Sequence, residues 1–152
     1  MHSTRVTRHI DAAPSAVYRA LLDAAAVAQW RVPAGMTIVV HAFDAREGGY
    51  FRVSLTYDAP EAAGKSTAHT DTYHGHFREL VPDAKVVEVL EFETDDPDLR
   101  GEMTMTTTLT AVDGGTDVDV LHEGLPDVVP AADNELGTRI ALDKLAALVE
   151  TS

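Results

Sequence analysis

The sequence predicts an α+β domain in which one long C-terminal helix packs against a curved antiparallel sheet. Residues 130–150 carry apolar side chains at helical spacing, which predicts an amphipathic helix with one apolar stripe. That stripe consists of Leu136, Ile140, Ala141, Leu145 and Leu148. Nearly all of residues 35–124 instead shows the alternation and β-branched composition of strands. The helix must bury its stripe against that sheet, and the space between the two is where a ligand would lie.

The first thirty residues predict one strand followed by two short helices. Residues 3–10 alternate and form the first strand. Pro14 suits the first turn of a helix, where its missing N–H costs nothing. The alanine-rich residues 23–30 form a second helix that ends at Trp30, the single tryptophan. This side chain either fills the core or lines the mouth of a pocket, because it offers a large apolar face and one N–H.

Six further strands are expected before the last helix. Their ranges are 36–43, 50–58, 69–81, 86–93, 103–111 and 116–123. Pro82 ends one of them because proline cannot donate to a sheet ladder, and Gly114 with Gly115 marks a hairpin turn. Residues 59–68 are small and polar, so we expect a surface loop that is more mobile than its flanking strands and is the candidate lid.

Composition limits the classes of partner. A chain of 152 residues is most simply a single domain, residues 1–152. Its net charge of −13 argues against nucleic acid and anionic membrane as partners, since both require basic patches. The absence of cysteine excludes disulfides and thiol chemistry. The N-terminus lacks the apolar core of a signal peptide and no apolar run reaches membrane-spanning length, so the predicted location is cytoplasmic.

A hairpin turn at residues 82–85 predicts a carboxylate pair on the concave face of the sheet. If that turn sets the register, Glu79 lies opposite Glu88. The neighbours that set the apolar face are Phe77, Val81, Val86 and Leu90. Two facing carboxylates would raise the pKa of at least one of them and could serve acid–base chemistry. The alternative is that both lie in water at the sheet end, or pair with a cation such as Arg52, Arg78 or Lys85.

Three histidines need separate interpretation. His122 falls on the core face of its strand, where it is either a hydrogen-bonded core residue or a general base. His74 and His76 have a spacing that can bind zinc, but the sequence offers no further ligand, so we predict no metal and no cofactor. The sequence also contains no phosphate-binding glycine loop, nucleophile elbow or zinc-protease motif.

The order of these elements resembles the START-like superfamily, which includes the SRPBCC, polyketide-cyclase and birch-allergen-like proteins. More narrowly, the chain is similar to the family named for homology to the activator of the heat-shock-protein (Hsp) ATPase. The motifs that carry the resemblance are APSAVYRALLD (13–23), GGYFRV (48–53), HGHFRELVPDAKVVEV (74–89), GGTDVDVLHEGLP (114–126) and DNELGTRIALDKLAALVE (133–150). The resemblance implies a helix-grip fold, in which a seven-stranded antiparallel sheet wraps around the long helix and often encloses a cavity. It also implies a possible homodimer.

The favoured function is binding of an apolar or aromatic small molecule in that cavity. The candidate ligand-contacting residues are Trp30, Phe51, Leu55, Tyr57, Tyr73, Phe77, Glu79, Glu88, Leu90, Met105 and His122. One alternative is a cyclase or hydrolase that uses Glu88 or His122 as its base. Another is a chaperone-interaction module that works through its surface. The superfamily includes ligand binders, cyclases and co-chaperones, so the resemblance does not choose between these classes.

Overall fold

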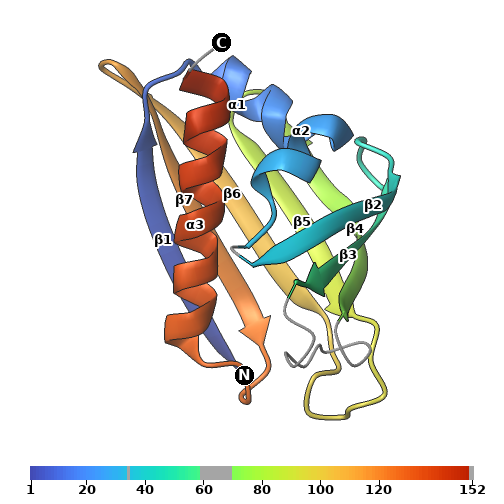
Figure 1. Cartoon of the computed structure of the whole chain (residues 1–152). Helices are drawn as coiled ribbons and strands as arrows, with labels where there is room; N and C mark the ends of the chain where they lie inside the picture. The colour runs from blue at the N-terminus through green and yellow to red at the C-terminus, as the bar shows by residue number, and fades with distance from the viewer. Residues whose placement is uncertain (34, 59–69, 151–152) are drawn as a thin grey trace.

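The computed structural model describes residues 1–33, 35–58 and 70–150 (Figure 1). In chain order the elements are β1 (His2–Ile10), α1 (Pro14–Leu21), α2 (Ala24–Trp30), β2 (Met36–Phe43), β3 (Tyr50–Tyr57), β4 (Thr70–Val81), β5 (Lys85–Phe92), β6 (Met103–Val112), β7 (Gly115–Leu125) and α3 (Ala131–Glu150). The candidate lid at residues 59–68 lies outside the described residues, as does His69. Among the described helices, none combines the length and apolarity needed to cross a membrane.

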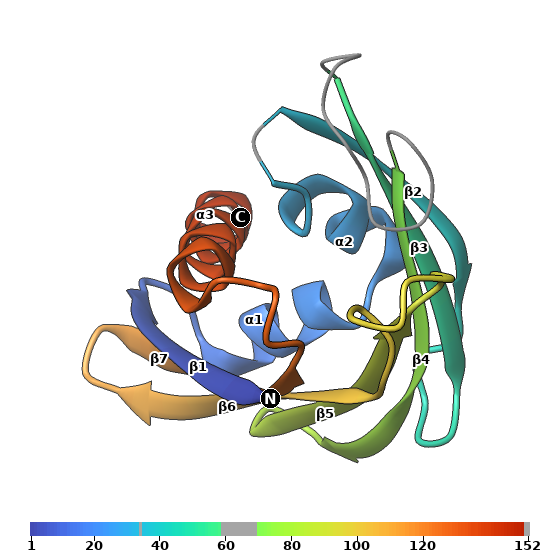
Figure 2. The ribbon, with the colours of Figure 1, turned by 90° about the horizontal axis from the view of Figure 1, so that it is seen from below.

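The strands form one antiparallel sheet in the order β1-β7-β6-β5-β4-β3-β2. Figure 2 shows the sheet curling so that α1, α2 and α3 all lie on its concave side. The long helix α3 packs against β1, and α2 contacts both α3 and β2. The predicted helix-grip architecture is therefore confirmed, and the space between sheet and helices is the place where a site can form.

The prediction that Glu79 faces Glu88 is wrong because the hairpin contains a β-bulge. Phe77 pairs with Glu88, but the next pair is Glu79 with Val87, so one extra residue lies on β4. A bulge of this kind reverses which side chains share a face. Glu79 therefore lies on the convex face, where it forms an ion pair with Lys85, a cation that the sequence had offered.

The apolar stripe of α3 also differs from the prediction in its first half. Leu136 is 59% exposed, whereas Leu142, Leu145 and Val149 are buried. The C-terminal half of the helix therefore packs into the hydrophobic core. The side chains that its N-terminal half turns toward the sheet are small or polar, and they leave room for the cavity described below.

Candidate functional site

A cavity of about 550 Å³ lies between the concave face of the sheet and the helices α2 and α3. Most of its wall is apolar, as is usual for small-molecule sites. The predicted ligand-contacting residues that line it are Trp30, Leu55, Tyr57, Tyr73, Leu90, Met105 and His122. Polar wall residues that the sequence interpretation did not name are Arg31, Asp71, Thr107, Asp133, Asn134 and Thr138.

Four of the predicted side chains lie elsewhere. Phe51 and Phe77 pack against each other in the core, with ring centroids 5.2 Å apart, and do not form part of the wall. Glu79 is on the convex face, and Glu88 is buried behind the wall, where it contacts Arg31. Strand alternation therefore placed the apolar side chains on the correct face of the sheet, but it did not show which of them line the cavity and which are buried in the core.

Trp30 combines the two interpretations offered by the sequence. It is buried in the core, and its indole Nε1 donates a 2.9 Å hydrogen bond to the carbonyl oxygen of Ala20. Its ring also forms part of the cavity wall. Because the N–H is already used, Trp30 offers a ligand an apolar surface rather than a donor.

A buried ion pair joins the end of α2 to β5. The Arg31 Nη1 atom donates to Glu88 Oε1 over 2.6 Å, and the two side chains are 15% and 5% exposed. The Arg31 guanidinium carbon also lies 5.4 Å from the centroid of the Tyr73 ring, within cation–π range. Burial opposes the charge of Arg31, but the Glu88 carboxylate outweighs it and raises the pKa of Arg31 above its usual value.

This pair bears on the enzyme hypothesis. The Glu88 carboxylate already accepts a hydrogen bond from the Arg31 guanidinium, so its Oε1 oxygen is engaged while the pair is intact. The catalytic interpretation of Glu88 assumed a carboxylate without a cation. One weak signal in the sequence points to the true partner, an arginine directly after the apolar end of α2.

His122 faces inward from β7, as the alternation predicted. The Thr4 hydroxyl donates to Asn134 Oδ1 over 2.5 Å, which turns the Asn134 Nδ2 amide toward His122 Nδ1 at 3.3 Å. His122 Nδ1 then accepts this amide hydrogen, so the ring proton lies on Nε2. Burial, and to a smaller extent the positive charge of Arg31, lowers the pKa of His122 to about 4. The ring is therefore neutral at pH 7.

Two polar atoms of residues that line the cavity lack a hydrogen-bond partner among residues 1–33, 35–58 and 70–150. Within the described part of the chain, Tyr73 Oη and His122 Nε2 are buried and form no hydrogen bond. Both residues line the cavity. A buried polar group without a partner costs about 1–3 kcal/mol, so most native structures avoid one unless a water or ligand completes it.

We expect His122 to make the protein acid-sensitive. Its folded pKa lies below its unfolded value of 6.5, so the unfolded chain takes up the proton first as the pH falls. The stability that neutral His122 supports is present above pH 6.5 and is lost toward pH 4, by about 3 kcal/mol. Urea denaturation of wild type and His122→Gln at several pH values measures how the difference between their free energies of unfolding changes with pH. A difference that stays constant from pH 7 to pH 4 would contradict the burial of a neutral ring.

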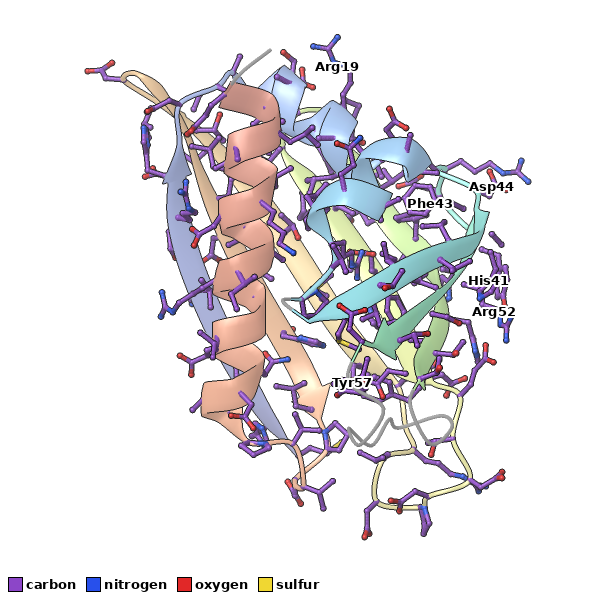
Figure 3. All side chains as sticks on the ribbon, in the orientation of Figure 1. Arg19, His41, Phe43, Asp44, Arg52 and Tyr57 are labelled. Atoms are coloured by element: carbon purple, nitrogen blue, oxygen red, sulfur yellow. The ribbon has the colours of Figure 1, made fainter. Side chains whose placement is uncertain are left out.

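The histidines on the convex face have a different environment. His74 Nδ1 lies 3.0 Å from Glu93 Oε2, and its Nε2 lies 3.0 Å from Glu91 Oε1. Arg52 donates to both carboxylate oxygens of Glu93, at 2.8 and 3.0 Å. Figure 3 shows Arg52 on the outer side of the sheet, away from α3. This cluster is a surface ion-pair network outside the cavity.

Comparisons with known proteins agree with this architecture. Residues 11–150 match the family model described as Activator of Hsp90 ATPase homolog 1-like protein. The crystal structure of a protein from Chromobacterium violaceum is similar, with a TM-score of 0.87, 34% identity, and coverage of 98% of this chain and 97% of that one. No significant match was found among curated proteins.

More distant solved structures share the fold. An AHSA1-like protein from Aeromonas hydrophila has a TM-score of 0.74 at 18% identity, with coverage of 98% of this chain and 92% of that one. The protein DynU16 of the dynemicin biosynthetic locus has a TM-score of 0.70 at 20% identity, with coverage of 99% of this chain and 48% of that one. The family match spans nearly the whole sequence. The chain therefore belongs to the Activator of Hsp90 ATPase homolog 1-like family.

Proposed function

We propose that this protein binds an apolar or aromatic small molecule in the cavity between the sheet and α3. The observation that carries the proposal is the cavity itself, about 550 Å³ in volume, with a mainly apolar wall and a few polar groups. Volumes of about 300–1,000 Å³ with this kind of lining are typical of small-molecule sites. A core without such a space would instead have favoured the surface-interaction alternative.

The enzyme alternative has less support from the same side chains. Glu88 accepts a hydrogen bond from Arg31, so its carboxylate is engaged by a cation. His122 has a pKa of about 4, and in its neutral ring the hydrogen lies on Nε2, the nitrogen that does not contact Asn134. His122 is therefore a weak general base near pH 7, because a general base works best when its pKa lies near the working pH. The cavity therefore supports binding better than proton abstraction.

A substitution at Gly137 tests whether the cavity is the binding site. Gly137 lines the cavity, and a Cβ placed there would meet no atom within 4 Å. Gly137→Phe should therefore fill part of the cavity without displacing the backbone. We expect it to weaken the binding of the neutral fluorescent probe N-phenyl-1-naphthylamine at least tenfold in a fluorescence titration.

Gly137→Ala is the matched control. It adds one methyl group, so probe binding should remain, and the helix should gain about 0.5–1 kcal/mol because alanine is the better helix former. The proposal fails if wild type does not bind the probe saturably, or if Gly137→Phe binds it as tightly as Gly137→Ala does.

A further inference from the structure

The polar part of the cavity wall offers hydrogen-bond donors. In the described residues the Arg31 guanidinium, which has five N–H groups, makes one hydrogen bond to Glu88 through Nη1. His122 presents Nε2–H, because Asn134 occupies Nδ1. The Tyr73 hydroxyl has no partner in the part of the chain that the structure describes, and the Arg31 guanidinium lies over its ring. An occupant that satisfies this wall must supply acceptors.

The charges in the wall argue that the acceptor is uncharged. Arg31 is neutralised by Glu88, and His122 is neutral, so the donor group as a whole carries no net charge. A carboxylate ligand would add an unbalanced negative charge at low dielectric, which is costly, whereas a carbonyl oxygen would not.

We propose that the ligand is an uncharged apolar molecule with a carbonyl oxygen, such as an aryl ketone, and that Tyr73, His122 and Arg31 bind this oxygen. The proposal rests on the function proposed above and adds the chemical class of the ligand. The Tyr73 hydroxyl and His122 Nε2–H then gain the partner that they lack among the described residues. The apolar body of the ligand lies against side chains such as Leu90 and Met105.

Three naphthalene compounds of similar size separate the alternatives. We would displace bound N-phenyl-1-naphthylamine with 2-acetylnaphthalene, 2-ethylnaphthalene and 2-naphthoate. The ketone should compete about three- to tenfold better than the ethyl compound, the gain expected from one good hydrogen bond. It should also compete at least tenfold better than the carboxylate.

Two tyrosine variants test which hydroxyl is responsible. Tyr73→Phe should remove most of the advantage of the ketone over the ethyl compound. Tyr50→Phe is the matched control, because Tyr50 lies on β3, is 47% exposed and is not among the residues that line the cavity. It should leave the advantage unchanged.

The outcomes distinguish the two proposals. Equal competition by the ketone and the ethyl compound, or an unchanged advantage in Tyr73→Phe, overturns the carbonyl inference while cavity binding stands. Tightest competition by 2-naphthoate overturns the uncharged class. Failure of wild type to bind the fluorescent probe at all overturns the proposed function and this inference with it.

Discussion

Arg31→Met is expected to lower the free energy of unfolding by about 3–5 kcal/mol. The reason is that the Glu88 carboxylate, 5% exposed, would keep its burial and lose its 2.6 Å partner. An unpaired buried charge is far more costly than the pair it came from. Urea denaturation at pH 7 measures the loss.

The double variant Arg31→Met/Glu88→Met is the control for this prediction. It removes both charges together and replaces them with apolar side chains, so most of the lost stability should return. If Arg31→Met alone costs less than about 1 kcal/mol, the pair behaves like an exposed salt bridge. Arg31 and Glu88 would then not form a buried ion pair.

Leu145→Ala should cost about 2–5 kcal/mol because Leu145 is fully buried where α3 packs into the core. Leu136→Ala on the same helix is the matched control. Its side chain is 59% exposed, so the change should stay within about 0.5 kcal/mol. Chemical denaturation of both variants checks the contrast. Equal midpoints for the two would mean that the C-terminal half of α3 does not close the core.

Much of the fold was predictable because strand alternation and helical spacing are local properties. The predicted range 36–43 coincides with β2, and the other described strands agree to within a few residues. The Glu79–Glu88 pair failed because one bulged residue reversed the face, and a bulge leaves no clear mark in the sequence. The prediction that Leu136 belongs to the buried stripe was wrong, because periodicity shows that a helix has an apolar side but not how far along the helix the core extends.

The polar site was harder to predict because its partners are distant in sequence. Arg31 and Glu88 are 57 residues apart, and Thr4 and Asn134 are 130 apart. The inward direction of His122 followed from strand alternation, but its tautomer depends on that remote Thr4–Asn134 contact. Single-chain patterns therefore located the concave face, while the hydrogen-bonding of its polar groups required the assembled fold.

Methionine methyl groups give the most direct test of the cavity as a binding site. Of the four methionines, Met36, Met103 and Met105 line the cavity, whereas Met1 is 85% exposed at the N-terminus. With ¹³C-methyl labelling, a titration with N-phenyl-1-naphthylamine should shift the three cavity signals saturably, with one dissociation constant, and leave Met1 in place. Saturable probe binding that leaves Met36, Met103 and Met105 unshifted would place the ligand elsewhere and contradict the account.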